Sequence, residues 1–254
     1  MTDRIVVGGA DVEYRIWGDG KPEVVLLHDG LGSVAQWRDT PAALHDRLGV
    51  PVLAYNRPGH GGSSPIPGGP WPTLWLHHQA RLLADLLDQL QILDPLLVGH
   101  SDGGSISLIH AMSGAQCRAV VALAPHSFVE AVCVEEISAL RADPDRLVSS
   151  LAAYHRQPAA IFEAWSGVWV SEEFGRWDIR DRLSAVSCPT LVAQGDVDAY
   201  ATDKQLWSTV EAIGANARGE MLSGYGHLIH HQSIDVVVDL VQESFGSTSG
   251  NRLG

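Results

Sequence analysis

A serine flanked by small residues is the feature of this sequence best suited to covalent chemistry. Residues 99–103, Gly-His-Ser-Asp-Gly, follow an apolar run and precede a stretch with helical spacing of apolar side chains. A tight turn from a strand into a helix needs small residues on both sides of the serine, and it exposes the hydroxyl at the end of the strand. The helix start would offer N–H groups and positive partial charge to an oxyanion. The pattern therefore favours Ser101 as a nucleophile over an incidental serine in a glycine-rich turn.

The elements around this serine alternate as they do in an α/β sheet. Two short runs, residues 5–8 and 12–17, predict an opening hairpin. Unbroken apolar runs, typical of strands buried on both faces, occupy residues 24–28, 52–55, 96–99, 119–124 and 190–193. Apolar residues recur at intervals of three and four over 75–93 and again from 234 to 245, which predicts helices. We therefore expect a mostly parallel central sheet flanked by helices.

Residues 126–187 interrupt this alternation. The segment has no convincing buried strand, and it is helical in pattern and rich in aromatic residues: Tyr154, Phe162, Trp165, Trp169, Phe174 and Trp177. Because it lies between two predicted core strands, we interpret it as a helical lid inserted into the core. The predicted core is then residues 1–125 and 188–245, and residues 246–254 are expected to form a flexible tail.

Several motifs resemble those of the α/β-hydrolase superfamily, and the resemblance covers roughly residues 5–245. Residues 28–32 (HDGLG) are similar to the family's oxyanion loop, and residues 56–63 (NRPGHGGS) to a second family loop. Asp29 stands where glycine is usual, and Asn56 where aspartate is usual. The resemblance implies the α/β-hydrolase fold and covalent acyl transfer. Backbone N–H groups of Asp102 and of either Gly30 or Leu31 would then hold the oxyanion.

The resemblance also implies an acid and a base that follow the serine in the chain order Ser, Asp, His. It places the acid at Asp198, the third residue after the glycine of Gln194-Gly195; Asp196 competes for this role, and its other interpretation is a loop carboxylate. The base is His227, in the GxGH context of residues 224–227. His227 would take the Ser101 proton while Asp198 orients the imidazole.

Four residues are candidates for contact with the substrate: Asp102, Asp29, Trp165 and Trp169. Asp102 is either a helix-start carboxylate stabilised by the helix dipole or the partner of a cationic group, such as the amine of an amino ester. The string Ser-Asp-Gly-Gly resembles hydrolases of the valacyclovir-hydrolase type, which supports the second interpretation. Asp29 would add negative charge beside the oxyanion site. Trp165 and Trp169 either line a pocket above Ser101 or hold the lid to the core.

Composition restricts the partners. The chain has 254 residues with 17 Lys and Arg against 30 Asp and Glu, a net charge of −13 that disfavours nucleic acids and anionic membrane surfaces. No apolar run approaches the roughly 20 residues that span a bilayer, and the first residues do not resemble a secretion signal. Cys117, Cys133 and Cys188 lack any CxxC spacing and are expected to be free and buried. We expect a cytoplasmic protein that binds a small-molecule substrate, and a homodimer is compatible with the sequence.

These features favour a serine hydrolase that cleaves a small ester, thioester, lactone or amide. C–C bond hydrolysis with the same three residues is the alternative on this scaffold, and a non-enzymatic ligand receptor is the alternative from another class. Within the superfamily, a serine at 101 argues against the reactions that use a carboxylate nucleophile. Metal binding at His227, His230 and His231 is disfavoured because no carboxylate or thiolate falls at a fitting spacing. We therefore expect neither a metal nor a cofactor.

Overall fold

A single mixed sheet organises the part of the chain that the structure describes. The computed structural model describes residues 2–66 and 71–249, and within them eight strands lie in the order β1-β2-β4-β3-β5-β6-β7-β8. β2 is antiparallel to both of its neighbours, and the other pairs are parallel. The strands are β1 (Asp3–Val7), β2 (Ala10–Trp17), β3 (Val24–Leu27), β4 (Val52–Tyr55), β5 (Leu96–His100), β6 (Ala119–Leu123), β7 (Thr190–Gly195) and β8 (Ala217–Leu222).

The burial of the central strands explains their apolar sequences. Every residue of β3, β4, β5, β6 and β7 is buried, because helices cover both faces of the sheet. These five strands begin at the residues where the apolar runs begin. The predicted α/β class with a mostly parallel sheet and flanking helices is therefore confirmed.

Two helices pack on one face of the sheet and three on the other. α1 (Thr40–Leu48) and α9 (Ile234–Ser249) contact each other and contribute to the same apolar cluster. α2 (Trp75–Gln89), α3 (Asp102–Met112) and α7 (Asp203–Ile213) contribute to the second cluster. Four leucines of α2 that recur at intervals of three and four are buried, as helical spacing predicts: Leu76, Leu83, Leu86 and Leu87.

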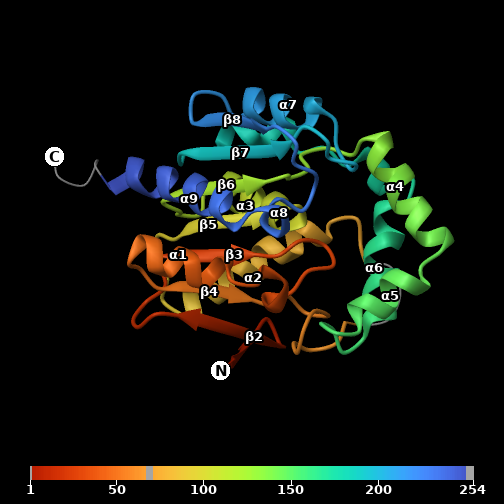
Figure 1. The fold of residues 1–254 in the computed structure, drawn as a ribbon, viewed down its shortest axis with the longest axis horizontal. Coiled ribbons are helices and arrows are strands. Elements are labelled where there is room, and N and C mark those ends of the chain that lie inside the picture. Colours follow the sequence, from red (N-terminus) through yellow and green to blue (C-terminus); the bar gives the residue numbers. More distant parts are fainter. Residues whose placement is uncertain (1, 67–70, 250–254) are drawn as a thin grey trace.

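Residues 126–187, all of which the structure describes, contain helices and no strand. They form α4 (Ala131–Ala142), α5 (Asp145–Leu151), α6 (Pro158–Trp169) and the short 3-10 helices η2 (Phe174–Arg176) and η3 (Arg180–Ala185). The extended pairing within the segment is one isolated bridge between Phe128 and Asp178. α6 contacts both α4 and α5, and the three helices lie together beside one end of the sheet, at the right of Figure 1. We refer to residues 126–187 as the helical insertion.

The C-terminal helix is longer than the sequence suggested. α9 extends to Ser249, so residues 246–249 are helical rather than part of the predicted tail, and residues 250–254 lie outside the described residues. Short helices complete the chain: η1 (Val34–Trp37) and α8 (Ile229–Gln232). In the described part of the chain, no helix combines the length and the apolar character needed to cross a bilayer.

The packing of α1 against α9 gives a direct test of this core. Leu44 of α1 is completely buried, whereas Leu93, in the turn before β5, is 76% exposed. We predict that Leu44→Ala lowers the free energy of unfolding by about 2–5 kcal/mol because it leaves a cavity. Leu93→Ala should change it by less than about 0.5 kcal/mol. Urea unfolding measures both, and equal losses in the two variants would contradict this arrangement of the core.

Candidate active site

Ser101 lies at a tight junction between β5 and α3. β5 ends at His100 and α3 begins at Asp102, so the serine alone makes the turn. Its backbone is strained, with φ 52° and ψ −117°, in a region that side-chain-bearing residues rarely adopt. Ser101 N–H donates to Leu123 O of the neighbouring strand at 2.8 Å, which anchors the junction to the sheet. The strand–turn–helix context expected from the sequence is present.

The glycines on either side of Ser101 are required by close backbone approach. A Cβ added at Gly99 would lie 2.2 Å from Gly103 O. A Cβ at Gly103 would lie 2.0 Å from Leu27 O, in the strand beside β5. Because these neighbours are backbone atoms, neither position can take a larger residue without moving the sheet. The glycines therefore hold α3 close against β3 and β5.

The structure brings Ser101, His227 and Asp198 together at the carboxyl ends of the strands. His227 Nε2 lies 2.9 Å from Ser101 Oγ, and His227 Nδ1 lies 2.8 Å from Asp198 Oδ2. Asp198 Oδ1 accepts a second bond from Tyr200 N–H at 2.8 Å. Asp196, the competing acid, lies elsewhere, and its Oδ1 accepts a hydrogen bond from Gly224 N–H at 2.7 Å. Asp198 thus has the contact to the histidine, and Asp196 supports the loop that carries it.

The environment of Asp198 keeps its carboxylate charged. Its side chain is fully buried, and burial alone would raise its pKa. The hydrogen bond and charge of His227, together with the Tyr200 N–H, outweigh burial and lower the pKa of Asp198 below its ordinary value. A charged carboxylate at Nδ1 keeps a proton on that nitrogen, which leaves Nε2 free to accept the serine proton.

The loop after β3 lines the same site with Asp29, Gly30 and Leu31. Leu31 N–H donates to Asp29 Oδ1 at 3.0 Å, so this amide already has a partner within the loop. Within the described residues, Gly30 N–H makes no hydrogen bond. Arg57, which is 1% exposed, donates to His28 O at 2.5 Å and Asp29 O at 2.7 Å. The two Arg57 bonds therefore fix the loop, and the Gly30 amide has no protein partner among the described residues.

Asp102 joins the start of α3 to the helical insertion. Its carboxylate is buried, and Oδ2 accepts a hydrogen bond from Trp165 Nε1 at 3.1 Å, whereas Oδ1 has no partner. Burial raises the pKa of Asp102 to about 7, although the nearby charge of Arg57 opposes the rise. A Cβ at Gly30 would lie 2.1 Å from Trp165 Nε1 and 2.4 Å from Asp102 Oδ2. The absence of a side chain at Gly30 leaves room for this contact.

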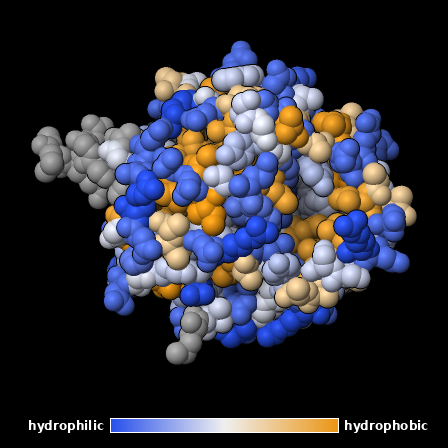
Figure 2. Space-filling model, viewed as in Figure 1, coloured by the Kyte–Doolittle hydropathy of each residue, from blue (hydrophilic) through white to orange (hydrophobic). Residues whose placement is uncertain are grey.

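A cavity of about 230 Å³ lies between the sheet and the helical insertion. In Figure 2 hydrophobic residues gather beside the hollow between the insertion, at the right, and the rest of the molecule. Ser101 and His227 face the cavity from the sheet side, and both predicted tryptophans line it from α6. The lining from α4 and α5 is mostly apolar: Cys133, Ile137, Leu140, Leu147, Ser150 and Leu151.

Of the predicted substrate contacts, Asp29 is the one whose oxygens already have protein partners. It lines the cavity, but Oδ1 accepts from Leu31 N–H and Oδ2 lies 3.6 Å from His100 Nδ1. Burial alone would raise the pKa of Asp29, but the contact with His100 outweighs burial and lowers this pKa well below its ordinary value. Its carboxylate therefore shapes the loop. The expectation that Asp29 adds negative charge beside an oxyanion site stays a prediction.

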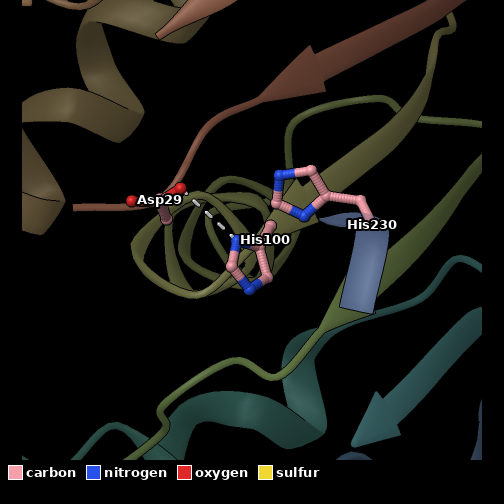
Figure 3. Close-up of side chains that lie close together, drawn as sticks. All are labelled: Asp29, His100 and His230. Carbon is pink, nitrogen blue, oxygen red and sulfur yellow. Dashed lines mark ion pairs between the residues drawn. The ribbon is translucent and has the colours of Figure 1, made fainter. Parts of the chain in front are cut away.

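His100 connects this loop to His227. Its side chain is completely buried, and Nε2–H donates to the backbone carbonyl of His227 at 2.7 Å. Figure 3 shows Asp29, His100 and His230 converging from three segments: the loop after β3, the end of β5 and α8. Among the described residues, their ligating atoms lie within 4.8 Å of one another, so this group could hold a metal ion. His100 and Asp29 already hold the His227 and Leu31 backbones, and the expectation of no metal stays a prediction.

Sequence reasoning missed several residues of the site. His100 and Arg57 were present in the motifs but had no role assigned, and their contacts are to backbone carbonyls far along the chain. Tyr200 packs against His227, with ring centroids 4.7 Å apart. The ring centroid of His126 lies 6.0 Å from that of His227, and burial lowers the pKa of His126 to about 3, which keeps it neutral. For Tyr200, its position two residues after the predicted acid was a sequence signal that it lies near the site.

The bond from His100 to the His227 carbonyl predicts a selective effect on turnover. His100→Leu removes the donor and should lower kcat about 10- to 100-fold with little change in KM, because the base loses its fixed position. His100→Gln retains an N–H donor near the same point and should recover most of the loss. His110→Leu, at the far end of α3 from Ser101, is the control for lost stability. Steady-state kinetics on an activated ester in which all three variants match the wild type would contradict this role.

Several known proteins resemble this chain in sequence. The sequence model of the Alpha/beta hydrolase family matches residues 24–240. A non-heme haloperoxidase from Rhodococcus erythropolis is 25% identical over 86% of this chain and 90% of its own length. Several shorter matches are 35–38% identical, but there the chain spans only 33–34% of the curated relatives.

Solved structures agree on the fold. An enol-lactonase from Burkholderia xenovorans LB400 has a TM-score of 0.76 with 22% identity, and the match covers 96% of this chain and all of that one (100%). A meta-cleavage product hydrolase from Pseudomonas fluorescens IP01 has a TM-score of 0.73 with 19% identity, over 96% of this chain and 97% of that one. At these identities the likeness is one of fold.

Proposed function

The chain belongs to the alpha/beta hydrolase family, and on that premise we propose that it is a serine hydrolase that cleaves a small carboxylic ester, lactone, thioester or amide. The observation that carries the proposal is the chain of contacts from Asp198 through His227 to Ser101, at 2.8 Å and 2.9 Å, beside a cavity. A nucleophile, a base and an orienting acid in this geometry are the parts that acyl transfer requires.

In the proposed reaction Ser101 Oγ attacks the substrate carbonyl while His227 Nε2 takes its proton. The C–O bond to the alcohol then breaks, and His227 returns the proton to the leaving oxygen, which leaves an acyl group on Ser101. Water, activated by His227 in the same way, hydrolyses the acyl-enzyme. Asp198 stays charged throughout and holds the imidazole in the productive tautomer.

The oxyanion would be held by the backbone N–H groups of Asp102 and Gly30. Asp102 N–H is at the first position of α3, where the helix leaves its amides unpaired and adds positive partial charge. Gly30 is favoured over Leu31 because the Leu31 amide already donates to Asp29. Two fixed donors of this kind typically contribute about 3–4 kcal/mol each to stabilisation of the transition state.

Cavity size and lining support a small substrate with an apolar portion. About 230 Å³ holds a compact acyl or alkyl group, and the leucine and isoleucine side chains of α4 and α5 would contact it. The helical insertion would act as the lid, and Trp165 and Trp169 as its contacts above Ser101. No further macromolecular partner is needed for this reaction.

C–C bond hydrolysis is the second candidate, since it would use the same three residues. A meta-cleavage product hydrolase shares the fold, so this candidate needs a direct comparison. We expect turnover of p-nitrophenyl acetate and butyrate together with inertness toward a vinylogous diketone acid. Cleavage of the diketone with no ester hydrolysis would favour the second candidate. A receptor without catalysis would turn over neither compound.

Replacement of the nucleophile is the simplest test of the proposed reaction. Ser101→Ala should lower kcat for p-nitrophenyl butyrate about 10⁴-fold or more, because no acyl-enzyme can form. Binding of a product acid should persist, since the cavity is unchanged. Initial-rate measurements check the loss, and turnover of Ser101→Ala near the wild-type value would refute the assignment.

The unpartnered oxygen of Asp102 favours a substrate with a cationic group near the scissile carbonyl. Asp102→Asn keeps the backbone N–H of the oxyanion site but removes the charge. We predict a fall in kcat/KM of about 30-fold or more for amino-acid esters, and a much smaller change for neutral esters of the same size. Asp196→Asn removes one charge outside the cavity and is the matched control. Equal losses on cationic and neutral esters would contradict this specificity.

A further inference from the structure

Two of the three cysteines are in contact at the end of the sheet opposite Ser101. Cys117 Sγ and Cys188 Sγ are 3.2 Å apart, and both are free thiols. Cys117 precedes β6 by two residues and Cys188 precedes β7 by two residues. The pair therefore lies at the amino ends of parallel strands, whereas Ser101 follows the carboxyl end of β5. Neither thiol has a part in the proposed hydrolysis.

The sheet holds the backbone on both sides of this contact. β6 and β7 pair in register from Val120 and Thr190, and Val120 N–H donates to Pro189 O at 3.0 Å. Thr190 Oγ1 donates to Cys188 O at 3.1 Å. Because these bonds fix the backbone, the two sulfur atoms are already ordered near each other. A bond length of about 2.05 Å requires them to approach by about 1 Å, a distance that small side-chain rotations cover.

The thiols differ in acidity and are close to solvent. Cys117 is 9% exposed and Cys188 8%, and both line a surface depression with Gln116 and Ser187. The hydrogen bond between the two Sγ atoms lowers the pKa of Cys188, and the Thr190 hydroxyl adds to this effect. The same hydrogen bond and burial raise the pKa of Cys117. Cys188 is therefore the first of the two to present a thiolate to an oxidant.

We propose that Cys117 and Cys188 are a modification site that forms a reversible intramolecular disulfide when the protein meets a peroxide. The Cys188 thiolate attacks one peroxide oxygen, the O–O bond breaks, and a sulfenic acid and hydroxide result; the hydroxide takes up the proton that Cys188 released on ionisation and becomes water. Cys117 sulfur then attacks Cys188 sulfur and displaces a second water. In total, two thiols are oxidised and one hydrogen peroxide is reduced to two waters.

The cross-link would stabilise the folded protein by restricting the unfolded chain, and the restricted segment includes the helical insertion. Cys117 and Cys188 are 71 positions apart, and the segment between them contains β6 and the whole of the insertion. Closing so long a loop restricts the unfolded ensemble strongly, so the disulfide should raise Tm by about 5 °C or more. The proposed active site lies at the carboxyl ends of the strands, away from the cysteines, so ester turnover should be unchanged.

The experiment counts thiols before and after treatment of the folded full-length protein with hydrogen peroxide. The reduced protein should show three reactive thiols in denaturant and the treated protein one, with a disulfide between the peptides that contain Cys117 and Cys188. Dithiothreitol should restore three thiols and the original Tm. Peptide mass spectrometry under non-reducing conditions identifies the linkage.

Serine variants separate this pair from the third thiol. Cys133→Ser should still form the cross-link and fall from two thiols to none. Cys117→Ser and Cys188→Ser should each fail to form an intramolecular disulfide and show no rise in Tm after treatment. Three thiols that persist in the treated wild type, a linkage that involves Cys133, or a linkage between two chains would each overturn the proposal. None of these readouts depends on hydrolase activity.

Discussion

The strained backbone of Ser101 is the constraint on which the rest of the site depends. A φ of 52° at a residue with a side chain persists only where the surrounding structure enforces it. Here β5 and α3 meet with one residue between them, and Gly99 and Gly103 let the helix approach the sheet at distances that no Cβ would permit. The same packing that strains the serine also places it at the N-terminus of α3.

A buried polar network holds the remaining parts against this junction. Asp29 faces His100, His100 bonds the carbonyl of His227, and Arg57 bonds the carbonyls of His28 and Asp29. The loop after β3 and the loop that carries His227 are thus connected through His100, the residue before Ser101. Buried charges of this kind stabilise little on balance, but they fix geometry when each has a partner.

Local patterns predicted the sheet, the order of elements along the chain and the place of Ser101, because buried strands and tight turns restrict residue types over short stretches. The places of Asp198 and His227 were implied by the resemblance to the superfamily. Two features depend on contacts that spacing does not encode. Asp29 took the place of a usual glycine, and its partner His100 lies 71 positions further along the chain. The orientation of α4–α6 follows from tertiary packing, so the sequence did not predict that Trp165 points toward Asp102. Helical periodicity likewise did not indicate that α9 continues to Ser249.

The central claim is that Ser101 is a nucleophile activated by His227. Covalent labelling by a fluorophosphonate tests it most directly, because the reagent reacts with activated serines and leaves a stable adduct. The account predicts one adduct per chain in the intact mass, mapped to the peptide that contains Ser101 and greatly slowed in His227→Ala. An unlabelled wild-type protein, or an adduct on a residue other than Ser101, would contradict it.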